Sequence, residues 1–396
     1  MSKSLGTVTR GIKAPIIKEG DDLPKIVVES VLSASEENNF ALNDKDVVAV
    51  TEAVLARAQG NYASVTDIAD DVKAKFPSGE IGLIFPIMSR NRFAMCLKGI
   101  ARGVKKIYLM LSYPSDEVGN PLITAEQLET SGVNPYTDVL SEEKFRELFG
   151  SEKHRFTGVD YIEYYKELVT GEGAEVEMLF GNSPVAILKY TSNVICADIH
   201  TRKLTKERLI KNGAVRVAGL DEILNESVNG SGFNPDYGIL GSNKSTEEKI
   251  KLFPKNGRAF VEDVAERFFE KTGKRVEVMI NGDGAFKDPV GFIWELADPV
   301  VSPAFTDGLK GTPNELKLKY LADNEFSDLK GDELKNAVRD RIKHKKDDLK
   351  GDMASQGTTP RFLTDLLGSL ADLTSGSGDK GTPIVLIQGY FDNYAD

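Results

Sequence analysis

The feature that most constrains the fold of this chain is a strand–helix–strand pattern in its first third. Two apolar runs, residues 81–85 and 105–111, predict buried strands, and residues 89–102 between them carry apolar side chains at helical spacing. A strand, a helix and a second strand within about 30 residues form a right-handed crossover with parallel strands. Because open parallel sheets bind ligands at the carboxyl ends of their strands, we expect Arg90 and Arg92 to lie near a site.

Composition narrows the functions that remain. The chain has 396 residues, which suggests two or three domains at about 100–200 residues each, and its net charge is -11. An acidic chain is a poor candidate for sequence-independent nucleic-acid binding, which needs a basic surface. Two isolated cysteines and three scattered histidines argue against a disulfide framework and against a thiolate or multi-histidine metal centre. A bound metal would therefore have oxygen ligands, which favours Mg²⁺ or Mn²⁺.

The chain shows no membrane signal. Residues 1–17 contain no uninterrupted apolar segment of the kind found in signal peptides, and the chain has no apolar stretch long enough to span a bilayer. We therefore expect a cytoplasmic protein with no membrane partner.

The remaining elements predict a mixed α and β fold, an α+β protein that contains an α/β crossover unit. Polar residues 117–172 have the composition of an insertion packed on a core. Further strands are expected at residues 46–51, 175–180, 185–190, 193–199, 215–217, 275–280 and 383–387. The main helices are expected at residues 22–32, 52–59, 203–211, 259–271, 316–352 and 360–373.

Two glycine-rich turns could bind phosphate. The turn 281–284 with Asp288 beyond it places Asp283 and Asp288 just past a buried strand, where carboxylates commonly hold a nucleotide-bound divalent cation, although a hairpin turn has the same residues. Gly376, Gly378 and Gly381 have the spacing of a dinucleotide fingerprint. That motif needs a strand before it and a helix after it, and here the order is reversed, so we reject a Rossmann NAD site. A phosphate-binding turn or a plain connection remains.

Charged side chains elsewhere are weaker candidates. Arg57, Arg90 and Arg92 could bind phosphate or carboxylate through their fixed fork of donors. Solvated arginines on helix surfaces are the more common outcome. Asp198 and His200 could form a metal or acid–base pair, and a surface hydrogen bond is the alternative.

Five segments, in order, resemble the coenzyme F420-0:gamma-glutamyl ligase family. The first is residues 15–23 (PIIKEGDDL), similar to that family's Pro-Leu-Ile-Lys-x-Gly-Asp-Asp-Leu. The others are a strand with the following helix, a Gly-Ile-x-x-Ser-Asn loop, a strand with an acidic turn, and the C-terminal glycine-rich turn with its strand. These four lie at residues 46–60, 237–243, 273–292 and 371–389.

The resemblance implies a gamma-glutamyl ligase-like fold with a large insertion, residues 1–60 and 175–396 forming the core and residues 61–174 the inserted α/β segment. It implies a homodimer that uses GTP (or ATP) with Mg or Mn to join glutamate, or another amino acid, to a carboxylate through an acyl phosphate. Asp283 and Arg57 would be catalytic, and Asp283 would hold the metal together with Asp288, which the local acidic pattern adds. The nucleotide would contact Pro15, Ile16, Ile17, Arg57, Ser242, Asn243, Gly376, Gly378 and Gly381.

Two positions depart from the family pattern. Leu240 and Ser377 stand where the family has a metal-binding aspartate and a glutamate. Asp198, Asp236 and Asp379 are candidates to replace them. The alternative hypothesis is a non-catalytic relative that binds a phosphorylated small molecule.

Overall fold

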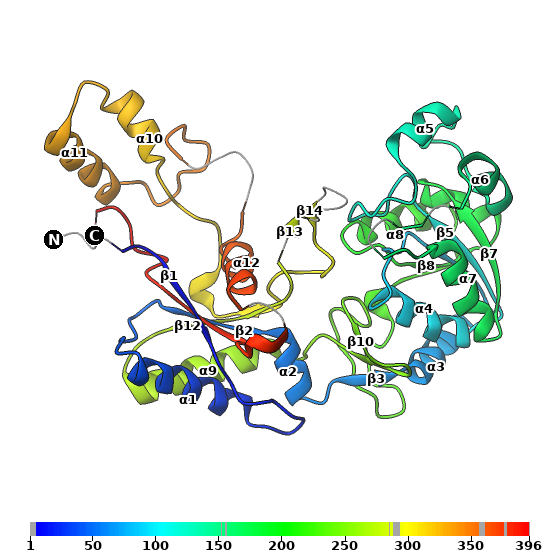
Figure 1. The fold of residues 1–396 in the computed structure, drawn as a ribbon, viewed down its shortest axis with the longest axis horizontal. Coiled ribbons are helices and arrows are strands. Elements are labelled where there is room, and N and C mark those ends of the chain that lie inside the picture. Colours follow the sequence, from blue (N-terminus) through cyan, green and yellow to red (C-terminus); the bar gives the residue numbers. More distant parts are fainter. Residues whose placement is uncertain are drawn as a thin grey trace.

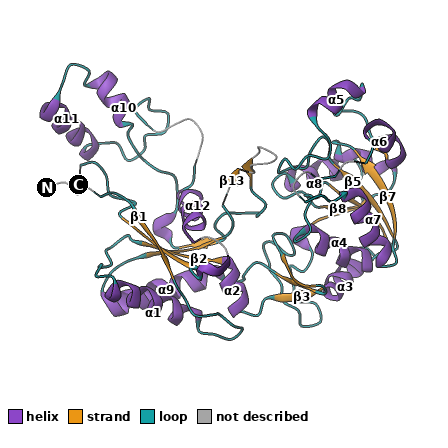
Figure 2. Cartoon of the chain, viewed as in Figure 1, coloured by secondary structure: helices purple, strands orange, loops and turns teal. Residues whose placement is uncertain are grey.

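The computed structural model describes residues 5–151, 153–154, 157–284, 286–287, 294–355, 361–375 and 378–395. Two sheets with their own helices form the two ends of the molecule, and a small three-stranded sheet lies between them (Figures 1 and 2). The model contains both helices and mixed sheets, as expected for an α+β protein. Among the described residues, no helix is both long enough and apolar enough to cross a membrane.

The first sheet has five strands in the order β1-β16-β2-β12-β15. β2 and β12 are parallel, and the other pairs are antiparallel. Alternate residues of β2 face opposite sides, so Val48 and Val50 pack under α1 and α9 while Val47 and Ala49 pack under α12. Its elements are β1 Val8–Ile12, α1 Leu23–Glu37, β2 Val47–Thr51, α9 Gly257–Thr272, β12 Glu277–Asn281, β15 Ala304–Phe305, α12 Leu363–Ser375 and β16 Ile384–Gln388.

Helix α1 begins at Leu23, one residue after its expected start, and ends at Glu37, beyond its expected end at residue 32. Asp22 caps it by accepting a hydrogen bond from the Lys25 backbone N at 3.1 Å. Val27, Val28 and Val31 are buried within this chain. They therefore need no second subunit to cover them.

The second sheet has six strands in the order β6-β7-β5-β4-β8-β9, all parallel except β6. The predicted parallel crossover is confirmed as β4, α4 and β5. The strand order reverses between β4 and β8, the point at which open parallel sheets bind ligands. Its elements are β4 Glu80–Ile84, α4 Phe93–Arg102, β5 Lys106–Leu111, β6 Leu140–Ser141, α7 Tyr161–Gly171, β7 Glu175–Phe180, β8 Asn193–Cys196, α8 Arg202–Lys211 and β9 Arg216–Gly219.

The six-stranded sheet contains strands from before and from after residue 174, the expected end of the insertion. β7 begins at Glu175 and pairs with β5 along its whole length. The small sheet β10-β11-β3 then joins the two ends of the molecule. Its strands and the remaining smaller elements are β3 Tyr62–Ser64, β10 Asn243–Thr246, β11 Lys249–Lys251, α2 Glu52–Ala58, α3 Val65–Lys75, α5 Ala125–Ser131, α6 Glu142–Phe149, β13 Phe286–Lys287 and β14 Trp294–Glu295, with 3-10 turns at Leu220–Glu222, Asp307–Leu309 and Gly378–Lys380.

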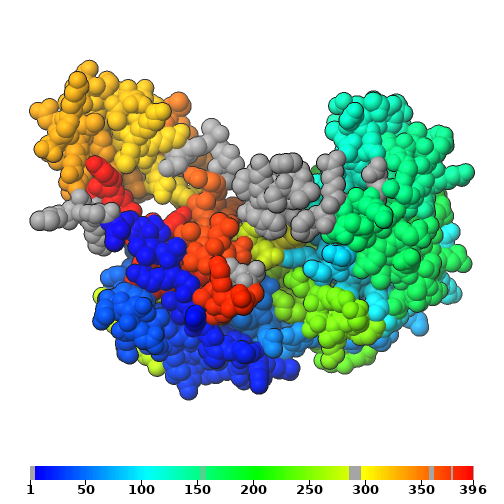
Figure 3. Space-filling model, viewed as in Figure 1, coloured from blue at the N-terminus to red at the C-terminus, as the bar shows by residue number. Residues whose placement is uncertain are grey.

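Two expected elements were wrong in type or extent. The strand expected at 185–190 is a 3-10 helix, Pro184–Lys189, because Pro184 suits a helix start and Ile187 packs on the second sheet. The helix expected at 316–352 is divided into α10 Leu318–Tyr320, a π-helical turn Leu321–Glu325 and α11 Gly331–Lys343, which have a small core of their own. These helices form an arm that stands away from the second sheet (Figure 3).

Helix α4 begins at Phe93, four residues later than the sequence predicts. The Ser89 hydroxyl accepts a hydrogen bond from the Arg92 backbone N at 3.1 Å, which holds residues 89–92 as a loop. Arg92 therefore lies in the loop that follows β4 and not on the surface of the helix.

Candidate functional site

The candidate site lies at the carboxyl ends of the parallel strands β2 and β12. Thr51 and Asn281 are paired across these strands, so the residues that follow them lie at one edge of the sheet. Glu52, the first residue of α2, is buried there. Asp283 follows β12, and its side chain is 56 % exposed. Two carboxylates, one buried and one open to solvent, therefore meet at this edge.

A third carboxylate, Asp298, joins this edge and receives an arginine from the second sheet. Asp298 is buried, and one of its oxygens accepts a hydrogen bond from the Asp283 backbone N at 2.7 Å. Its other oxygen accepts from Arg92 Nη1. Arg92 Nη2 donates to Asp283 Oδ2 at 2.6 Å. The guanidinium thus bridges both aspartates.

Glu52 has a cation of its own. Lys251 Nζ, on β11, lies 2.6 and 2.7 Å from the two oxygens of Glu52. The side chains of Glu52 and Lys251 are 10 % and 15 % exposed. Each buried carboxylate at this edge is therefore paired with a cation that comes from residues 61–251.

Burial controls the electrostatics of the site. It raises the pKa of Glu52, a rise that Lys251 opposes and that Asp298 and Asp283 increase. Burial also raises the pKa of Asp298, against the opposing charge of Arg92. For Arg92 itself, burial lowers the pKa, but Asp298 and Asp283 outweigh it and the pKa is raised. Arg92 therefore remains a cation.

A fourth carboxylate approaches from α12. Asp372 Oδ2 accepts a hydrogen bond from the Gly284 backbone N at 3.0 Å. Burial raises the pKa of Asp372, and the neighbouring charge of Asp283 raises it further. The edge is thus acidic apart from the cations of Arg92 and Lys251.

The expected nucleotide-binding segments of the first sheet reach the same edge. The Ala14 backbone N donates to Gly381 O at 3.1 Å, and the Thr51 backbone N donates to Pro383 O at 3.0 Å. Residues 15–17, Gly381 and the start of α2 are thereby brought together. Ile16 and Arg57 are exposed, and Ile17 is buried. Gly378 and Asp379 lie exposed in the turn before β16, whereas Gly376 and Ser377 are outside the described residues.

Ser242 and Asn243 differ in their surroundings. Ser242 is buried, and its hydroxyl lies 3.6 Å from Cys96 Sγ. Asn243 is partly exposed and is paired with Lys251 across β10 and β11. Asn243 therefore lies beside the cation that holds Glu52, whereas Ser242 packs against α4.

Asp198 and His200 do not face one common site. Asp198 is buried and accepts hydrogen bonds from the hydroxyls of Thr201 and Thr205 at 2.8 and 2.6 Å, which ties it to the start of α8. His200 is exposed, and its Nε2 lies 2.9 Å from Leu296 O. Arg90 is exposed in the loop before α4.

The described residues do not form a preformed metal centre. Among them, no group of three or more His, Cys, Asp and Glu side chains is arranged to hold a metal ion. Leu240 is 2 % exposed and belongs to an apolar core. Asp283 is bonded to Arg92. Asp288, the other expected ligand, is outside the described residues.

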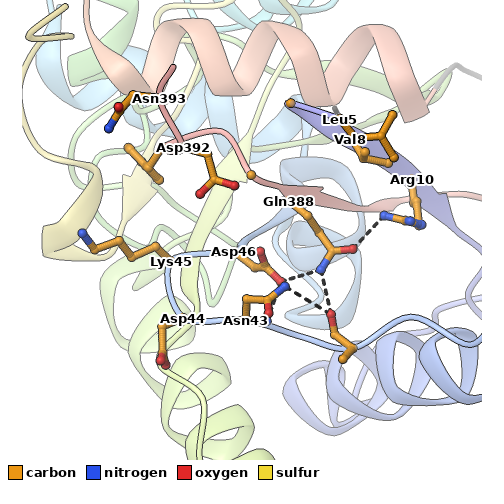
Figure 4. Close-up of a pocket in the computed structure, with 14 residues that line it drawn as sticks. Leu5, Val8, Arg10, Asn43, Asp44, Lys45, Asp46, Gln388, Asp392 and Asn393 are labelled. Atoms are coloured by element: carbon orange, nitrogen blue, oxygen red, sulfur yellow. Dashed lines mark hydrogen bonds between the residues drawn. The ribbon is translucent and has the colours of Figure 1, made fainter. Parts of the chain in front are cut away.

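A separate cavity of about 580 Å³ lies beside the amino end of β2, at the opposite edge of the first sheet (Figure 4). Its polar groups bond to one another. Arg10 Nη1 donates to Gln388 Oε1 at 2.7 Å, and Gln388 Nε2 donates to Asp46 Oδ2 at 2.6 Å. Because this cavity is away from the acidic edge, it contributes no residue to the candidate site.

Sequence reasoning missed Glu52, Lys251, Asp298 and Asp372. Glu52 had a signal, because it directly follows a predicted buried strand. Asp298 and Lys251 had none, since neither follows an element whose end the sequence places at the site.

Comparison with known proteins adds the family. The family model described as F420-0:Gamma-glutamyl ligase matches residues 11–389, a range that includes residues 61–174. No curated protein matches the chain. The match covers nearly the whole chain and agrees with the five segments that suggested this family, so the chain belongs to the F420-0:gamma-glutamyl ligase family.

Proposed function

We propose that this protein is a nucleotide-driven amide ligase that joins glutamate or another amino acid to a small-molecule carboxylate. The family is one of ligases. One observation supports the finer proposal: residues 15–17, Gly381 and the start of α2, the helix that carries Arg57, reach the same sheet edge as Asp283. Basic and glycine-rich groups for phosphate thus adjoin a carboxylate-rich edge.

The reaction would proceed in two displacements. An oxygen of the acceptor carboxylate attacks the γ-phosphorus of GTP or ATP, and the nucleoside diphosphate leaves. The amine of the amino acid then attacks the acyl carbon, inorganic phosphate leaves, and the amine proton passes to a base or to water. Such phosphoryl transfer depends on positioning and charge stabilisation more than on covalent help from the protein.

Arg57 could contact phosphate oxygens, because it is an exposed arginine in the last turn of α2, the helix whose first residue, Glu52, lies at this edge. Mg²⁺ or Mn²⁺ would bind together with the nucleotide phosphates, since the described residues contain no group of three or more ligands that could hold the ion alone.

We also propose that the protein is a homodimer. Light scattering that reported the monomer mass of 43.4 kDa would contradict this.

The test measures glutamate-dependent phosphate release with GTP or ATP, divalent metal and a panel of carboxylates. Asp283→Asn keeps the shape of the turn and removes a charge, so release should fall by orders of magnitude while the fold is unchanged. Asp323→Asn, at an exposed position on the α10–α11 arm, is the matched control and should have no effect.

One observation favours a second function. Leu240 is buried where the family has a metal-binding aspartate, as expected if ligase chemistry has been lost and phosphate binding kept. A nucleotide at a hundredfold excess over Kd stabilises the folded state by about 2.7 kcal/mol. A thermal shift without turnover of any acceptor would favour this binding protein. If nucleotide causes no thermal shift and no acceptor is turned over, while a positive control responds, both functions are contradicted.

A further inference from the structure

The cations at the acidic edge come from the chain itself. We call the five-stranded sheet with its helices and connections the first sheet unit, and the six-stranded sheet with its helices and connections the second. Arg92 and Lys251 both belong to residues 61–251, and they pair with Asp298 and Glu52 of the first sheet unit. The side chains of Arg92, Lys251 and Glu52 are between 10 % and 15 % exposed. The side chain of Asp298 is 3 % exposed. The two ion pairs therefore have little contact with solvent.

Arg92 uses both terminal nitrogens to bridge two carboxylates. Nη1 bonds Asp298 Oδ1, and Nη2 bonds Asp283 Oδ2 at 2.6 Å. Asp298 Oδ2 is already occupied by the Asp283 backbone N at 2.7 Å. A cation that bridged the two aspartates through Asp298 Oδ1 and Asp283 Oδ2 would need the same two oxygens that the guanidinium now holds.

A guanidinium and a divalent ion cannot share these oxygens. They compete for the same lone pairs and repel each other as like charges. Mg²⁺ also loses its water reluctantly, whereas a guanidinium is weakly hydrated and is tethered here by the backbone. The Asp283–Asp298 pair therefore binds the guanidinium of Arg92 in preference to a free divalent ion.

We propose that Arg92 is a built-in cation that closes the Asp283–Asp298 pair to divalent metal, so that the pair accepts a metal only when Arg92 leaves it. Arg92 is then a positioning residue, supplied by the second sheet unit to the site on the first. The proposal rests on this ion-pair geometry and not on the ligase reaction, so failure of the phosphate-release test would leave it standing.

The experiment titrates Mn²⁺ alone into the full-length protein and measures free Mn²⁺ by electron paramagnetic resonance. Wild type should bind no Mn²⁺ at this pair. Arg92→Ala should bind one Mn²⁺ ion that wild type does not bind. Adding Asp298→Asn to Arg92→Ala should abolish that binding.

Arg102→Ala is the matched control. Arg102 lies on the same helix and also bridges two carboxylates, Glu172 at 2.7 Å and Glu248 at 2.9 Å. Lys98 pairs with both glutamates as well, so a tethered cation still bridges them in the variant. Arg102→Ala should therefore bind no Mn²⁺.

Three outcomes would overturn the proposal. Wild type could bind Mn²⁺ in a manner that Asp298→Asn removes. Folded Arg92→Ala could bind no Mn²⁺. If Arg92→Ala and the bulkier Arg92→Gln fail to fold with Mn²⁺ as well as without it, the ion has not replaced the guanidinium, and the proposal fails too.

Discussion

Arg92 and Asp298 are 206 positions apart in the chain and form an ion pair where the two sheet units meet. Two further contacts lie near this ion pair. His200 Nε2 lies 2.9 Å from Leu296 O, and the Lys244 backbone N donates a hydrogen bond to Asn91 O at 2.7 Å. Arg92 and His200 follow β4 and β8. The carboxyl ends of the second sheet therefore face the candidate site of the first.

Removing Lys251, the partner of Glu52, should destabilise the folded protein. Lys251→Met leaves Glu52 buried without a cation, which should lower the free energy of unfolding by about 3–5 kcal/mol. Urea denaturation measures the change. Lys249→Met, an exposed position on the same strand, should have little effect. The double variant Lys251→Met with Glu52→Gln should recover most of the loss, and a double variant as unstable as the single one would contradict the explanation.

Gly282 should tolerate no side chain. A Cβ there would lie 2.6 Å from Asp298 Oδ2, so Gly282→Ala must displace the carboxylate that Arg92 holds. We expect a loss of about 1–3 kcal/mol, again by urea denaturation. Gly171→Ala is the control, because nothing lies within 4 Å of its Cβ position. Equal stability of the two variants would show that Asp298 is not constrained at this position.

Asp116 should make stability depend on pH. Burial raises its pKa from 3.8 to about 6, although it accepts hydrogen bonds from Met88, Val118 and Asn120. A carboxyl with a raised pKa binds its proton more tightly in the folded state, so its ionisation costs stability. The free energy of unfolding should therefore fall by about 3 kcal/mol as pH rises from about 4 to about 6, and then level off.

The Asp116 effect can be isolated by comparison. Asp116→Asn cannot ionise, so its stability should decline less than that of wild type over the same pH range. Carbon-13 NMR of the Asp116 carboxyl gives the folded pKa directly. An observed pKa near 3.8 would refute the prediction.

The thiols should be inert in the folded protein. Burial raises the pKa of Cys96 to about 11 and also raises the pKa of Cys196, so both remain protonated. Since the thiolate is the reactive form, the native protein should show no fast reaction with a chromogenic disulfide at pH 8. Both thiols should react in urea. Rapid labelling of Cys96 under native conditions would mean that α4 opens away from Ser242.

Much of the fold could be predicted because it is local. The apolar runs at 46–51, 81–85 and 105–111 became β2, β4 and β5, and the parallel pairing of β4 with β5 follows from the short crossover between them. The strand expected at 185–190 failed because a six-residue apolar run has no distinctive period. Pro184 was the only local signal of a helix start there.

The candidate site was less predictable. Asp283 and Glu52 lie together because β2 and β12 pair in parallel, and no short crossover joins strands that are separated by most of the chain. Asp298 follows no predicted strand, so its sequence position carries no signal. The pairing of Asp283 with Arg92 is likewise not visible in the sequence, where the two residues are separate candidates for binding metal and phosphate.

The sequence by itself determined the local elements, the crossover and the family, because these depend on hydrophobic period and on short runs of residues read in order. The tertiary structure alone decided which charges meet. Packing of the second sheet unit against the first brings Arg92 to Asp298, and the pairing of β11 with β3 brings Lys251 to Glu52. Burying a charge is costly unless an opposite charge accompanies it, so these pairs form only where segments that are distant in the sequence meet, and no local pattern encodes that meeting.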